Sequence, residues 1–211
     1  MLDIYFIFAL VVAVTVHEFS HAWMASYLGD PTPRYMGRLT LNPLAHLDPI
    51  GTIMLFLAGF GWGKPVPFSM NYLRNPRVGS ALIALAGPLS NLVMALIFGV
   101  FYRYLFFNAG DLSQSSDFTL FLFRLMKTMI DLNLVLMIFN LLPIPPLDGS
   151  KVFALLIPGD YIEKLYRFRN YGYVILILIV FSPTLFNVNI LGQYIIYPVV
   201  KFFSDVILFS S

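Results

Sequence analysis

The alternation of long apolar stretches with short polar ones predicts a chain that crosses a membrane several times. A helix needs about 20 apolar residues to cross a bilayer. Four stretches reach that length, namely 4–28, 77–107, 118–142 and 171–209. The last is long enough for two helices, with a turn predicted over 182–189. The pattern therefore predicts an all-α integral membrane protein with about five to six transmembrane helices.

The region between the first two long stretches is predicted to be irregular and associated with the membrane. Residues 34–41 alternate enough, with enough β-branched and aromatic side chains, for a short strand. Residues 50–60 are apolar but too few to span a bilayer, so we expect a re-entrant or interfacial segment. The Gly/Pro-rich loop 61–67 contains Trp and Lys, which suit the bilayer interface. Irregular backbone at that depth needs cover from protein or a water-filled cavity, so this loop is expected near the entrance to a site.

Side chains within the long stretches indicate how the helices pack. The stretch 77–107 carries a face of small residues that suits close helix packing. These residues are Gly79, Ser80, Ala81, Ala84, Ala86, Gly87 and Ser90. Lys127 and Asp131 lie four residues apart in the stretch 118–142. Either they pair along the helix, or the outer turns of this helix project beyond the bilayer; the sequence leaves both open.

Composition supports a membrane protein and narrows its chemistry. Of the 211 residues, 59% are hydrophobic and 11% are charged, against about 25% charged in a soluble domain. The chain has the length of one domain, 1–211, with a core over 4–155 and C-terminal helices over 171–209. The absence of cysteine excludes disulfides, thiol catalysis and cysteine-bound zinc. No basic cluster with interleaved aromatic residues indicates nucleic-acid binding.

Loop charges predict the orientation of the chain. Residues 29–77 and 143–170 hold five and four basic residues, whereas 108–117 holds two aspartates and no basic residue. The positive-inside rule places the first two loops in the cytoplasm, and the N-terminus is then outside. The first stretch has no positively charged leading segment and is not interpreted as a cleaved signal peptide.

One short motif inside the first apolar stretch carries the chemistry. It reads His17-Glu18-Phe19-Ser20-His21. Histidines four residues apart on a helix share one face, so both imidazoles can reach one metal ion. Glu18 can then act on a metal-bound water as a general base, which is the pattern of zinc metalloproteases. Three ionisable groups within five residues at membrane depth also indicate a functional site, because each is costly there.

A catalytic zinc takes three protein ligands and a water, so a third ligand is needed. With no cysteine it must be His46 or a carboxylate. His46 lies in an interfacial loop and is expected to make ordinary hydrogen bonds there. Asp148 follows a proline-broken helix end, on the same predicted membrane side as the two histidines. From the residues alone, Asp148 is equally well explained as a turn residue before Gly149.

Three motifs in order make the chain resemble the site-2 protease family of intramembrane zinc metalloproteases. They are the HExxH motif, then Ala86-Gly-Pro-Leu-Ser-Asn91, then Asn140-x-x-Pro143-x-x-x-x-Asp148-Gly149. The resemblance covers about residues 4–155 and is strongest to the small bacterial branch, without a PDZ or CBS domain. It implies one Zn²⁺ held by His17, His21 and Asp148, with Glu18 catalytic. It also implies that Asn140 holds the substrate.

The expected function is hydrolysis of peptide bonds in or near transmembrane segments of membrane-protein substrates. The resemblance implies a multi-pass protein of a prokaryotic cell membrane, with the lipid bilayer as its surroundings. The loop charges place the active site toward the cytoplasm. Homo-oligomer formation is left open. Asn91 either faces the site or makes an interhelical hydrogen bond.

Two alternatives from other classes are a zinc-containing membrane binding protein without protease activity and a transporter. An intact Glu18 argues against the first, because a pure binding site needs no base. The absence of an inverted repeat in the sequence argues against the second.

Overall fold

The protein is helical wherever its structure is described. A computed structural model describes residues 3–58, 61–109, 116–158 and 169–208. Within those ranges the chain forms helices and turns, with no strand and one isolated β-bridge, between Leu47 and Gly63. This confirms the all-helical character that the sequence predicts.

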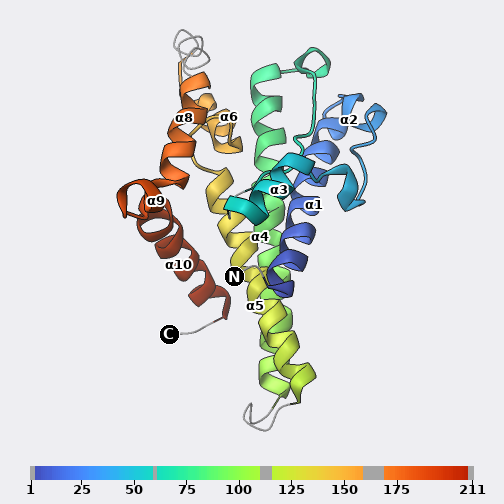
Figure 1. Ribbon diagram of the computed structural model, residues 1–211. Coiled ribbons are helices and arrows are strands. Elements are labelled where there is room, and N and C mark those ends of the chain that lie inside the picture. Colours follow the sequence, from blue (N-terminus) through green and yellow to red (C-terminus); the bar gives the residue numbers. More distant parts are fainter. Residues whose placement is uncertain (1–2, 59–60, 110–115, 159–168, 209–211) are drawn as a thin grey trace.

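Three long helices form the body of the molecule: α1 (Ile4–Tyr27), α4 (Pro76–Asn108) and α5 (Asp117–Asn140). They pack side by side, each against the other two (Figure 1). The predicted small-residue face of α4 is buried at Gly79, Ser80, Ala81, Ala84, Ala86 and Gly87. Helix α1 likewise buries Ala9, Ala13, Ala22 and Ala25. Small side chains let the backbones approach closely, which is the main source of helix association in lipid.

Three helical segments of the described chain are long and apolar enough to cross a membrane. They are α1, α4 and the stretch Ile190–Leu208. Helix α5 has the length of α1 but carries Arg124, Lys127 and Asp131, which reduce its apolar character. The predicted ion pair forms on its surface, with Lys127 Nζ 2.5 Å from Asp131 Oδ1. The predicted count of five to six transmembrane helices is not confirmed.

The strand predicted over 34–41 is wrong. The chain instead forms the helical turn α2 (Thr32–Tyr35), followed by Gly37 with φ of +67°. The buried Asp30 side chain stabilises this turn, because its Oδ1 accepts from the Thr32 backbone N–H at 2.9 Å. Prolines at the start of α2 also have the fixed φ that a helix needs. A local hydrogen bond from backbone to side chain thus prevails over the alternation that indicated a strand.

The remaining short elements before α4 are η1 (Pro43–Ala45), α3 (Pro49–Ala58) and η2 (Met70–Tyr72). Helix α3 coincides with the apolar stretch predicted to be re-entrant or interfacial. Its position relative to a bilayer stays a prediction.

After α5 the chain turns back on itself before the C-terminal helices. It forms α6 (Asp148–Phe153) and η4 (Ala154–Leu156), then α8 (Arg169–Val180) and α9 (Ser182–Phe186). The π-helical turn η5 (Ile190–Ile196) leads into α10 (Tyr197–Leu208). Figure 1 shows α8, α9 and α10 following one another along one side of the bundle. The break between α8 and α10 includes residues 182–189, where the sequence predicts a turn. Asn187 in this break has a φ of +53°.

The tight contact between α1 and α4 yields a testable prediction. Ala84 is fully buried on the small-residue face of α4, so Ala84→Leu adds three carbons at a packed position. We expect the free energy of unfolding in mixed detergent to fall by about 1–3 kcal/mol. Val93→Leu, at an exposed position of the same helix, is the control and should change stability little. Equal stability of the two variants would contradict the described packing.

Candidate metal centre

Two histidines from α1 and one aspartate from α6 converge inside the bundle. His17 Nε2 lies 3.0 Å from His21 Nε2. Asp148 Oδ2 lies 3.3 Å from His17 Nε2 and 3.1 Å from His21 Nε2. All three residues are buried, with exposed fractions of 6%, 7% and 8%. They form the one group of potential metal ligands found among the residues that the structure describes.

The hydrogen bonds behind the two rings fix which nitrogen faces the centre. His17 Nδ1 lies 2.7 Å from Asn91 Oδ1, and His21 Nδ1 lies 2.6 Å from the Ile83 carbonyl oxygen. Carbonyl oxygens only accept, so each ring donates from Nδ1 and turns Nε2 to the centre, and in the neutral ring this Nε2 is unprotonated. This is the ligand form of histidine, and its outer hydrogen bond is the usual support of a metal-bound ring.

The spacing of the three acceptor atoms fits a metal ion. Two nitrogen lone pairs and a carboxylate oxygen that face one another repel unless a cation lies among them. In a tetrahedral zinc site, neighbouring ligand atoms are roughly 3.3 Å apart. The observed separations of 3.0–3.3 Å are close to that value. Two histidines and one carboxylate also match a donor set that catalytic zinc uses.

The motif on α4 makes room for the rings and orients one of them. A Cβ atom at Gly87 would lie 2.5 Å from His21 Nε2 and 2.6 Å from His17 Cε1, so a larger residue would collide with both rings. Asn91, one turn further along α4, is fully buried and contacts His17. Both alternatives for Asn91 therefore hold, since it supports the site and also bonds between helices.

Sequence reasoning missed the next member of this chain of hydrogen bonds. Asn91 Nδ2 donates to Asn133 Oδ1 at 2.9 Å, and Asn133 Nδ2 donates to the Met129 carbonyl oxygen at 2.8 Å. Asn133 is fully buried on α5. The connection links α1, α4 and α5 through side-chain amides. A lone asparagine in an otherwise apolar stretch, seven residues before Asn140, was the signal that could have indicated it.

Asp148 reaches the histidines because the chain folds back sharply after α5. It is the first residue of α6. A Cβ atom at Gly149 would lie 2.2 Å from the Leu141 carbonyl oxygen, so only glycine lets α6 approach the end of α5 this closely. The second carboxylate oxygen, Asp148 Oδ1, lies 3.8 Å from Lys151 Nζ. The Asp-Gly pair is therefore part of a close approach between two helices.

Glu18 lies beside the ligand group without joining it. Its Oε2 is buried and has no hydrogen-bond partner among the described residues. The backbone of Gly63 covers the other oxygen, because a Cβ atom there would lie 3.5 Å from Glu18 Oε1. The loop 61–67, predicted to lie near the entrance to a site, thus passes next to the predicted catalytic residue.

Two other candidates lie outside the ligand group. His46 is fully buried, and its Nε2 lies 2.7 Å from the Thr40 carbonyl oxygen. This is the ordinary loop hydrogen bond that the sequence suggested for His46. Asp148, and not His46, lies beside His17 and His21. Asn140, at the end of α5, donates from Nδ2 to the Leu136 carbonyl oxygen of its own helix at 3.0 Å.

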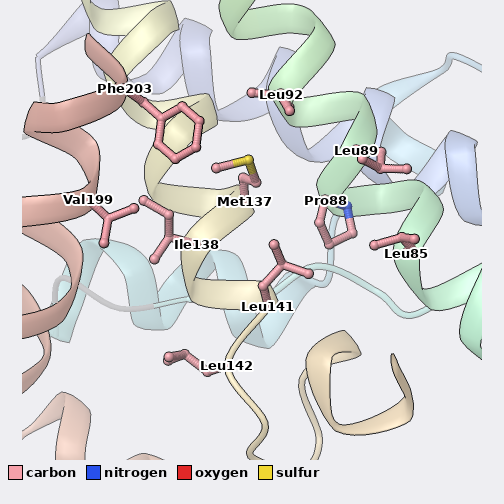
Figure 2. A pocket seen from close by; sticks show the side chains of 10 residues that line it. All are labelled: Leu85, Pro88, Leu89, Leu92, Met137, Ile138, Leu141, Leu142, Val199 and Phe203. Atoms are coloured by element: carbon pink, nitrogen blue, oxygen red, sulfur yellow. The ribbon is translucent and has the colours of Figure 1, made fainter. Parts of the chain in front are cut away.

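A separate apolar groove of about 420 Å³ lies among α4, α5 and α10. Figure 2 shows Leu89 and Pro88 of α4 on one wall, with Met137 and Ile138 of α5 and Phe203 of α10 around it. None of its lining residues is titratable. The convergent polar groups, and not the size of this groove, therefore define the candidate site.

Comparison with known proteins agrees with this geometry. The sequence profile of peptidase family M50 matches residues 5–183. YwhC of Bacillus subtilis, which is named as a zinc metalloprotease, is 38% identical over 97% of this chain and 89% of its own length. Rip2 of Mycolicibacterium smegmatis, named in the same way, is 29% identical over 85% of this chain and 69% of its own length. No solved structure matches the chain.

The amide chain behind His17 yields a testable prediction. Asn91→Leu removes the acceptor that fixes the ring, and Asn133→Leu removes the partner that fixes Asn91. We expect zinc affinity to fall about 10- to 100-fold in Asn91→Leu, with a smaller loss in Asn133→Leu. Competition with a chromophoric chelator measures this affinity. Asn108→Leu at the far end of α4 is the control, and a loss there equal to that of Asn91→Leu would contradict the proposed orienting role.

Proposed function

This chain belongs to peptidase family M50, and we propose that it hydrolyses peptide bonds in or near transmembrane segments of membrane-protein substrates. The family makes it a zinc metallopeptidase. The observation that carries the proposal is the convergence of two Nε2 atoms and one carboxylate oxygen within 3.3 Å, with Glu18 beside them. That arrangement lies between helices that are apolar on the outside.

We assign the roles of the residues from their positions. His17, His21 and Asp148 hold one Zn²⁺ per chain, and Glu18 is the general base. When bound, zinc lowers the pKa of a coordinated water toward about 7 and polarises the scissile carbonyl. Glu18 accepts the proton of that water at its carboxylate and passes it to the leaving amine. The unpartnered Oε2 of Glu18 suits this role, because no protein hydrogen bond has to break first.

Substrate binding is proposed for Asn140 and the loop 61–67. A transmembrane helix has its carbonyl groups hydrogen-bonded, so a substrate must unwind locally before attack. The extended loop beside Glu18 is placed to hold an unwound segment through backbone hydrogen bonds. Asn140 would exchange its present bond to the Leu136 carbonyl oxygen for a bond to the substrate.

We further propose that the site faces the cytoplasm of a prokaryotic cell. The ligand group lies toward the end of the bundle from which the basic loops project: His21 precedes the end of α1 by about two turns, and Asp148 follows α5. Water reaches the centre from that side. The protein crosses the membrane more than once in this arrangement, since three described segments are long and apolar enough to do so.

The proposed roles predict a different outcome for each of three variants. Glu18→Gln keeps size and shape but removes the proton acceptor, so it should retain zinc and lose cleavage by several orders of magnitude. Asp148→Asn should weaken zinc binding together with activity. Asn140→Ala should keep zinc and lose turnover more modestly, since only substrate hydrogen bonds disappear. Zinc content and cleavage of a co-reconstituted single-span substrate are measured for all three in parallel.

The outcomes separate the assignments. Full cleavage by Glu18→Gln would overturn the metalloprotease proposal. Loss of zinc in Glu18→Gln would show that Glu18 supports the metal and is not the base. Loss of zinc in His46→Ala with retention in Asp148→Asn would identify His46 as the third ligand.

The proposed orientation is tested by labelling introduced cysteines. The chain has no cysteine of its own, so single substitutions report cleanly. Ser116→Cys, before α5, should react with an impermeant maleimide on intact cells, whereas Tyr35→Cys in α2 should react only after lysis. Both side chains are exposed. Labelling of Tyr35→Cys alone from outside would reverse the topology and place the site on the other side.

A further inference from the structure

Arg38 is a buried arginine that the proposed mechanism does not use. It lies in the loop after α2, directly after Gly37, and only 4% of it is exposed. Arginine is rarely buried without a specific partner, because removing its charge from water is costly. The sequence suggested only that it helps to orient the chain in the membrane.

The guanidinium of Arg38 bonds to the segment that covers Glu18. Its Nη2 donates to the carbonyl oxygen of Lys64. On the other side of the backbone, the Lys64 N–H donates to the His46 carbonyl oxygen at 2.8 Å, and Gly63 forms the β-bridge with Leu47. Arg38 and the 46–47 backbone therefore hold residues 63–64 between them.

The same segment is anchored at its far end. The Ser69 backbone N–H donates to Asp30 Oδ2 at 2.6 Å, and Asp30 is fully buried. Between the two anchors stand Pro65 and Pro67, which have no N–H to donate. The segment 63–67 thus depends on contacts from outside itself for its position, and Arg38 supplies a side-chain bond at the end of the segment that lies next to Glu18.

Charge links Arg38 to Glu18 as well. Burial lowers the pKa of the Arg38 guanidinium, and the negative charge of Glu18 opposes that shift. Both groups keep a buried polar atom, Arg38 Nε and Glu18 Oε2, without a hydrogen-bond partner among the described residues. The two opposite charges therefore attract one another without forming a contact ion pair.

We propose that Arg38 is a positioning residue for peptide hydrolysis, which fixes the segment 63–67 against Glu18 so that the base and the substrate-holding segment keep one geometry. This inference rests on the proposed function for its effect on catalysis. The effect on the segment itself does not depend on any activity. A purely structural role for Arg38 would instead destabilise the whole bundle when the side chain is removed.

The experiment compares Arg38→Gln, Arg38→Lys and the control Arg34→Gln, each with and without Val66→Cys. Arg34 is exposed on α2, so Arg34→Gln removes the same charge without the buried contact. We measure the maleimide labelling rate of Val66→Cys, the zinc content, the melting temperature, and kcat and KM for a single-span substrate. The labelling rate reports the segment in protein that need not cleave anything.

In Arg38→Gln we expect severalfold faster labelling, unchanged zinc content, and a loss of kcat/KM of about 10- to 100-fold. Arg38→Lys should recover part of both effects, because an ammonium can still donate to the Lys64 carbonyl oxygen. Arg34→Gln should behave as the parent. Unchanged labelling in Arg38→Gln would overturn the proposal, as would loss of zinc together with a fall in melting temperature. If the parent cleaves no substrate while Arg38→Gln still labels faster, the proposed function is wrong. The role of Arg38 in holding the segment 63–67 is then still supported.

Discussion

The structure depends on bringing three electron-pair donors to one point inside an apolar bundle. His17, His21 and Asp148 come from the first and last elements of the core, and their donor atoms lie within 3.3 Å of one another. Without a cation such a cluster is unfavourable, because the donors repel and have lost their contact with water. The cluster can form only because α1 packs closely on α4 and because α6 turns back sharply onto the end of α5.

Glycine and asparagine meet those conditions at specific places. Gly87 leaves space for both rings, and Gly149 lets α6 approach the end of α5. Asn91 and Asn133 satisfy each other inside the bundle, where an unpaired amide would be costly. The same two asparagines hold one imidazole in its metal-binding form. Helix packing and the chemistry of the site are therefore properties of the same few contacts.

The sequence predicted the helical bundle and the two histidines of the ligand group because both follow from local rules. Apolar length indicates helices in lipid, and the i, i+4 spacing places His17 and His21 on one face. The position of Asp148 required the motif around it, since a turn explains Asp-Gly equally well. The strand over 34–41 failed because the buried Asp30 bonds to Thr32 in a helical turn and also to Ser69, and the contact with Ser69 cannot be seen in a local pattern. The sequence did not indicate the roles of Asn133 and Arg38 for the same reason, because each role depends on a hydrogen bond to a residue distant in sequence.

The separation of the ligands along the chain has a consequence for biosynthesis. His17 and His21 enter the membrane with the first helix, whereas Asp148 is made only after α4 and α5. A chain still on the ribosome can offer two ligands but not the third, so a firmly held metal appears only when the core is complete. A zinc metallopeptidase built in this way stays inactive until its own core is complete.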